Sequence, residues 1–168
     1  FKGKVEKMGG NVFQLAEEGR KGNQFTQTLE ALKNYAAIEL EYAKDLGPLF
    51  ESPSRKAELT EPEDLPPMSA DKVNRVTRDH RHYIAWKFEC ESFNTRATAL
   101  EANQLKLFTV ILLQCSQSVR MKLEATAGYE KAKEENDCLW ALTTLKNICH
   151  RSENRFVALV NAKAAIFN

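Results

Sequence analysis

The sequence predicts an all-α fold, and the placement of its prolines is the first reason. All five prolines lie between positions 48 and 67, and the rest of the chain contains none. Proline stops helices and biases the preceding residue towards extended backbone. Strand-like alternation is weak elsewhere, whereas apolar residues recur at helical spacing. These three observations predict a helical bundle, built as one unit or as two small lobes, with a proline-rich loop around residues 48–69.

The proline-rich loop also predicts how the chain is divided. Residues 51–69 are acidic and poor in aromatic side chains, which is typical of a linker. We therefore predict an N-terminal helical part over residues 1–50, a linker over 51–69 and a C-terminal helical bundle over 70–168. The linker is expected to be mobile and to have the least protected amides in hydrogen exchange.

Two helices are predicted before the linker. The first is short, over residues 11–18, with glycines on both sides. The second runs from about residue 23 to 46 and carries a broad apolar stripe at 100° per residue. Gly47 and Pro48 are the signals expected at its end. Glu39 falls inside the apolar stripe, which periodicity alone does not explain.

The most apolar helix is predicted in the second part of the chain. Ser69 or Asp71 can cap a helix that runs towards Phe93, and polar and β-branched residues near Asn94 allow a break there. The central helix then covers residues 100–115. Leucine, isoleucine, valine and phenylalanine point all round it, as expected for a helix at the centre of a bundle.

Three further helices are predicted after the central one. Ser116 or Ser118 can cap a short helix that Gly128 ends, and Asp137 can cap a helix over residues 138–150. The last helix is predicted over about residues 154–167.

Composition restricts the class of protein. The chain has 168 residues and a formal net charge of +1, so no overall field attracts it to nucleic acid or membrane. Its longest apolar run is far shorter than the roughly 20 residues that cross a bilayer, so no membrane partner is expected. The four cysteines lie in helix-like apolar contexts, which favours a reducing, cytoplasmic compartment. Because the first residue is Phe1, we expect a piece of a longer polypeptide.

No motif in the sequence supports catalysis. The nucleophile elbow, the phosphate-binding loop and the aspartic protease loop are all missing. Cys149 and His150 are neighbours, and neighbours on a helix diverge by about 100°. His80 and His82 would point roughly 200° apart on a helix, so they could not share a metal ion. The sequence therefore predicts a non-catalytic protein without a metal or other cofactor.

One local basic cluster is a candidate RNA-binding site. It consists of Lys72, Arg75, Arg78 and Arg81. Three-residue spacing keeps these cations on one half of a helix, where they could contact phosphates. The simpler interpretation is a solvated helix face. We favour it, because nucleic-acid-binding surfaces usually show a larger excess of positive charge.

Trp140 is a candidate assembly contact. On the helix over residues 138–150 it points about 100° away from Leu139, on the polar side with Thr144 and Asn147. A tryptophan has a large apolar area, so we expect it to be covered. Either another helix of the same chain or a second subunit can do this. We favour the same chain, because most large aromatic side chains are core residues.

Two blocks of sequence resemble a known family. Residues 1–15 read FKGKVEKMGGNVFQL, and the second block contains QCS at 114–116, MKLE at 121–124, ENDCLW at 135–140 and LKNI at 145–148. Both are similar to motifs of the Gag-like capsid region of copia-type LTR retrotransposons, although residues 10–13 depart slightly from the family's order. The resemblance implies a helical structural protein that self-assembles into a homo-oligomer and helps package the element's RNA.

Two other functions stay open. Residues 39–46, ELEYAKDL, are similar to a stretch early in F-BAR domains, which implies a helical membrane-associated module. The match covers one helix of common helix formers, and the chain lacks the extended basic face of such domains. The other alternative is a helical adaptor that acts through protein–protein contacts.

Overall fold

The structure confirms the all-α fold. The computed structural model describes residues 3–16, 24–52, 54–65 and 75–166. Within these ranges the helices are η1 (Glu6–Met8), α2 (Gln24–Glu39), η2 (Ala43–Phe50), α3 (Arg75–Leu113), α4 (Gln117–Glu124), α5 (Tyr129–Glu134) and α6 (Cys138–Ile166). Within the same ranges, β structure is limited to one isolated parallel bridge, which joins Phe13 to Cys115.

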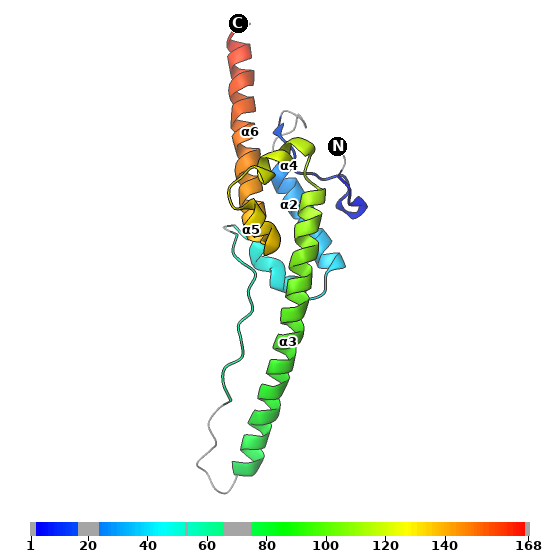
Figure 1. Ribbon diagram of the computed structural model, residues 1–168, viewed down its shortest axis with the longest axis vertical. Coiled ribbons are helices and arrows are strands. Elements are labelled where there is room, and N and C mark those ends of the chain that lie inside the picture. Colours follow the sequence, from blue (N-terminus) through cyan, green and yellow to red (C-terminus); the bar gives the residue numbers. More distant parts are fainter. Residues whose placement is uncertain (1–2, 17–23, 53, 66–74, 167–168) are drawn as a thin grey trace.

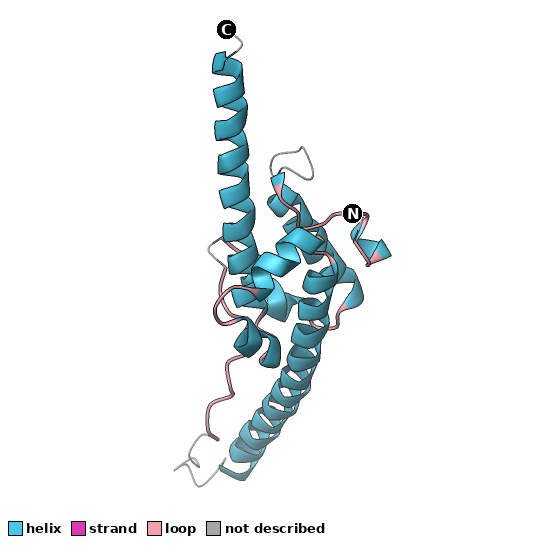
Figure 2. Ribbon diagram, turned by 45° about the horizontal axis from the view of Figure 1, so that its top comes forward, coloured by secondary structure: helices cyan, strands magenta, loops and turns pink. Residues whose placement is uncertain are grey.

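The molecule is elongated because its two longest helices extend beyond the packed centre in opposite directions. Figure 1 shows the first half of α3 leaving the centre at the bottom and the second half of α6 leaving it at the top. The shorter helices gather where the two long ones overlap, and the view in Figure 2 agrees. Two long helical surfaces therefore lie outside the shared core.

The break that the sequence allowed near Asn94 does not occur. Helix α3 is continuous over 39 residues, from Arg75 to Leu113. Thr95 and Thr98 donate their hydroxyl hydrogens to the carbonyl oxygens of Glu91 and Asn94, one turn earlier, at 2.9 and 3.0 Å. These side chains satisfy their hydroxyl groups without interrupting the backbone ladder, so polar and β-branched residues did not end the helix.

The central helix over residues 100–115 is the last part of α3, which ends at Leu113. Leu107, Phe108 and Ile111 are buried, as expected, but Leu105 is 53% exposed. The helix is therefore covered on most sides rather than all round. The two helices predicted over residues 138–150 and 154–167 are also one helix, α6, since neither proline nor glycine separates them.

The predicted helix over residues 11–18 is wrong for residues 11–15, which the structure shows in non-helical backbone; residues 17 and 18 lie outside the described residues. Helix α2 ends at Glu39, earlier than predicted, because Tyr42 adopts a left-handed backbone conformation with φ of 51°. The chain then forms the 3-10 helix η2, which contains Pro48 instead of stopping before it.

Glu39 has a partner that the helical pattern could not show. Its carboxylate lies 2.6 Å from the ammonium group of Lys7, which belongs to η1. This hydrogen-bonded pair raises the pKa of Lys7. Glu39 therefore faces the N-terminal segment, although the stripe around it is apolar.

One hydrophobic core combines residues from both sides of the proline-rich stretch. Phe13, Leu32 and Leu46 from the first part are buried with Leu107, Ile111 and Leu145 from the second. Arg96 adds a bidentate ion pair to Asp45, with its Nε 3.0 Å from Oδ2, and the pair raises the pKa of Arg96. Helix α3 is thus fixed to η2 by charge as well as by apolar contact.

The described part of the predicted linker is an extended segment, residues 54–65, which we call the strap. It lies beside α3 in both ribbon views. The indole nitrogen of Trp86 donates to the carbonyl oxygen of Glu63 at 3.0 Å, and Ala57 is buried. The mobility of the linker stays a prediction that hydrogen exchange can test. The hydrogen bond to Glu63 and the burial of Ala57 are two features that would restrain the strap.

Candidate interaction surface

Gln114 joins the N-terminal segment to the end of α3. Its side chain is fully buried, and its Oε1 accepts hydrogen bonds from the backbone N–H groups of Lys4 and Val5 at 2.9 and 3.0 Å. Its Nε2 donates to the carbonyl oxygen of Asn11 at 2.7 Å. These partners lie between 103 and 110 residues away in the sequence. One amide therefore satisfies three backbone groups of a segment that has little secondary structure of its own.

Gly3 makes this arrangement possible. Its φ is +76°, and a Cβ atom placed on it would come within 2.3 Å of the Gln114 side chain. Only glycine provides both the left-handed backbone and the space for the amide. We call the contact of residues 3–15 with residues 114–116 the junction. It also contains the bridge, in which Phe13 N–H donates to the backbone carbonyl oxygen of Gln114 and Ser116 N–H donates to that of Phe13, both at 2.8 Å.

The candidate RNA-binding residues are only partly placed by the structure. Lys72 lies outside the described residues. Arg75 and Arg78 belong to the first turn of α3, and their side chains also lie outside the description. Arg81 is exposed on α3, as are His80 and His82. The described residues therefore supply one exposed arginine and two histidines here, and no phosphate-binding cluster can be built from them.

Trp140, the candidate assembly contact, lies beside residues of its own chain. It is half-buried, and its ring centroid is 6.2 Å from that of Tyr129 at the start of α5. A Cβ atom on Gly128 would lie 3.2 Å from its indole nitrogen. The loop before α5 thus covers part of Trp140, and whether a second subunit covers the rest stays a prediction.

A surface that the sequence reasoning missed lies on the projecting part of α3. We call residues 79–93 the α3 arm. Trp86 and Phe93 share its inner face and are half-buried, with Trp86 bonded to the strap. Ile84 and Phe88 are 40% and 67% exposed. They are four residues apart and so lie on one face, roughly opposite Trp86. Their spacing was the signal available in the sequence.

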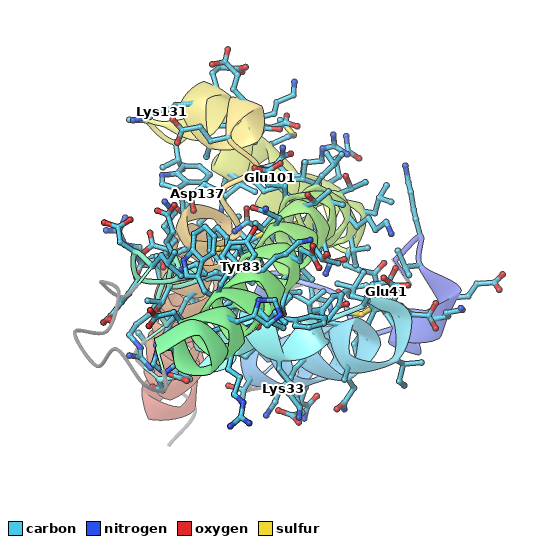
Figure 3. The ribbon with its side chains drawn as sticks, turned by 90° about the horizontal axis from the view of Figure 1, so that it is seen from below. Lys33, Glu41, Tyr83, Glu101, Lys131 and Asp137 are labelled. Atoms are coloured by element: carbon cyan, nitrogen blue, oxygen red, sulfur yellow. The ribbon has the colours of Figure 1, made fainter. Side chains whose placement is uncertain are left out.

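Charged residues continue the outer face of the α3 arm in both directions. Arg81 lies one turn before Ile84, and Glu91 lies one turn after Phe88. Both are exposed. Figure 3 looks up the molecule from below. It shows α3 between α2, which carries Lys33, and α5, which carries Lys131, so these two lysines lie on opposite sides of α3. Glu91 also pairs with the exposed Lys87 at 3.8 Å, a weak contact because both side chains are 60% exposed. The outer face thus has an apolar centre with Arg81 at one end and Glu91, next to Lys87, at the other.

A groove of about 700 Å³ runs between the strap and α3. Leu59, Pro62, Phe88 and Phe93 supply apolar walls, and the ion pair of Arg96 with Asp45 lies among its lining residues. Acidic side chains from both walls, including Glu61 and Glu89, border it. The groove therefore combines apolar walls, acidic borders and one ion pair.

The buried cysteines are poorly suited to catalysis. Burial raises the pKa of the Cys115 thiol to about 12, and that of the Cys138 thiol to about 12 as well. A thiolate is the reactive form, and a thiol with so high a pKa is almost entirely protonated at pH 8. Among the side chains that the structure describes, no three of His, Cys, Asp or Glu gather closely enough to hold a metal ion.

This difference between the cysteines can be measured directly. When the native chain is treated with iodoacetamide at pH 8, we expect Cys90 to be alkylated first, because it is half-exposed on the α3 arm. Cys115 and Cys138 should react at least a hundredfold more slowly. Mass spectrometry of the digested protein over time would give the three rates, and the unfolded chain in urea is the control. Rapid modification of Cys115 in the native chain would contradict its assigned burial.

Neither a protein family model nor a curated protein nor a solved structure matches this chain. Within the described ranges, none of the helices combines the length and the apolarity needed to cross a bilayer. The function is therefore inferred from the residues and contacts of this chain alone.

Proposed function

We propose that this chain is a non-catalytic structural protein, a Gag-like capsid domain of a retrotransposon that assembles with copies of itself and encloses RNA. The observation that carries the proposal is the junction. The two sequence blocks that resemble Gag motifs are distant in the chain, yet Gln114 of the second block binds the backbone of the first at three points. The motifs thus support one another in a single structural unit.

Other residues in or next to these blocks serve the same unit. The Sγ atom of Cys149 lies 3.8 Å from the carbonyl oxygen of Gln14, and Ser116 caps α4 by accepting from Val119 N–H. Gln114 and Ser116 therefore have roles in holding helices and segments together. This pattern favours a scaffold, because a catalytic motif would place reactive groups at a surface.

Exposed apolar side chains outside the core give the proposed assembly its surfaces. Phe88 and Met121 are 67% and 63% exposed, on α3 and α4. On the projecting part of α6, Val157 and Leu159 are 56% and 54% exposed. Scattered apolar residues are normal on any protein. Phe88, Val157 and Leu159 lie on the two helices that extend away from the core, so they offer contact surfaces that a neighbouring copy can reach.

Electron microscopy of the purified chain tests the proposal. We expect regular shells or tubes to form over part of a salt series from about 50 mM to 1 M, and single-stranded RNA to shift this range. Salt screens the repulsion and attraction between exposed charges, so assembly should depend on it. Particles that stay monomeric under all conditions would contradict the proposal.

The membrane alternative predicts a different result. Salt-sensitive co-sedimentation with anionic liposomes, with tubulation of the vesicles, would favour an F-BAR-like module over the capsid domain. We expect little protein in the liposome pellet, because the net charge is near zero.

A further inference from the structure

We propose that the outer face of the α3 arm binds the same face of a second copy in antiparallel orientation. This inference rests on the proposed self-assembly and names one of its interfaces. The face contains Ile84 and Phe88 at its centre, with Arg81 and Glu91 on either side. A second copy is inferred as the partner because the order of these four residues is self-complementary. When one copy is reversed, its apolar residues meet apolar residues and its Arg81 meets Glu91 of the other copy.

The geometry follows from the helical spacing. The four positions are separated by three, four and three residues, so they form one stripe along the helix. If two copies pair about a two-fold axis level with Trp86, Ile84 of one lies opposite Phe88 of the other. Arg81 of one then lies opposite Glu91 of the other. Two apolar layers are flanked by two oppositely charged layers, and each contact occurs twice, as two-fold symmetry requires.

A parallel arrangement would lose this complementarity. It would place Arg81 against Arg81 and Glu91 against Glu91, and like charges in contact oppose association. A membrane surface is also a poor match, because Glu91 and the nearby Glu89 are exposed and would repel anionic headgroups. The arrangement of charges therefore favours a second copy over either alternative.

The α3 arm is free to make this contact. Its inner face is held by the strap through Trp86, whereas Ile84 lies on the opposite side. Phe88 borders the groove next to the strap but is still 67% exposed, so a partner can reach it. It also projects from the core, as Figure 1 shows, so the bulk of one molecule does not prevent the other from approaching. An arm of 15 residues is about 22 Å long, which gives room for all four layers.

Charge exchange gives a test that keeps every residue exposed and helical. We expect sedimentation velocity at about 50 mM salt to show a monomer–dimer equilibrium for the unmodified chain. Arg81→Glu alone and Glu91→Arg alone should each weaken the dimer at least tenfold, since each places like charges opposite one another twice. The double variant Arg81→Glu with Glu91→Arg should restore the dimer to within about threefold.

Lys146→Glu is the matched control, because it changes the net charge as Arg81→Glu does but lies on α6, where it is exposed. It should leave the dimer unchanged. Circular dichroism of each variant checks the helical content. The inference is overturned if the unmodified chain stays monomeric, if the single variants dimerise normally, or if the double variant stays as weak as the single ones.

The failure of this interface and the failure of the proposed function can be told apart. If shells form in the microscope while all charge variants assemble normally, assembly is correct and this interface is wrong. If the charge variants behave as expected but no shells form, the interface is correct and the capsid function is wrong.

Discussion

Gln114→Ala is expected to lower the free energy of unfolding by about 3 kcal/mol, because a buried amide that binds three backbone groups is lost. Each such hydrogen bond contributes roughly 1 kcal/mol net, and buried groups left unpaired cost more. Lys4, Val5 and Asn11 supply these groups, and they have no helix of their own to replace the bonds. Urea unfolding followed by circular dichroism at 222 nm would measure the change.

Two variants separate hydrogen bonding from packing at this position. Gln114→Met keeps most of the side-chain volume but loses the amide, so it should be destabilised nearly as much as the alanine variant. Gln117→Ala removes an exposed glutamine three residues later, and should change stability by less than about 0.5 kcal/mol. A Met variant as stable as the unmodified chain would show that Gln114 acts through its volume. Hydrogen exchange should also become faster at the amides of Lys4 and Val5.

Trp140→Ala is expected to lower the free energy of unfolding by about 2 kcal/mol. A fully buried tryptophan costs roughly 3–5 kcal/mol when truncated to alanine, and Trp140 is only half-buried. The loss comes from its contact with Tyr129 and the loop at Gly128. Thermal unfolding would measure it, and assembly of the variant below its melting temperature should be normal.

Trp140→Phe is the matched control, because it keeps an aromatic ring beside Tyr129. We expect it to recover at least half of the loss. A near-normal melting temperature combined with loss of assembly in Trp140→Ala would place Trp140 at a subunit interface instead. A variant that is both fully stable and fully assembling would contradict both roles.

Local signals in the sequence were sufficient for the beginnings of α4 and α6, although they did not predict α5. Ser116 caps α4, and Asp137 accepts a hydrogen bond from Trp140 N–H at 2.9 Å at the start of α6, both as predicted. A cap depends on one short polar side chain and the backbone within three residues, so its information is local. The absence of proline outside residues 48–67 predicted the helical class for the same reason.

The candidate site was less predictable, because its residues act through distant contacts. Ile84 and Phe88 have the same helical spacing as core residues, and only the position of the strap decides that Trp86 faces inwards while they face solvent. Gln114 was identified from sequence only as part of the QCS motif at 114–116. Its bonds to the N-terminal segment could not be predicted, since no local pattern specifies a partner more than 100 residues away.

The sequence by itself determined that this protein is helical and where α4 and α6 begin, because propensity, proline placement and caps act over a few residues. Tertiary structure alone decided that α3 has no break at Asn94 and that α2 ends at Glu39, where that residue pairs with Lys7. It also decided that the left-handed Gly3 makes room for Gln114. These outcomes depend on the packing of segments that are distant in the chain, and their free energies exceed the small preferences of individual residues.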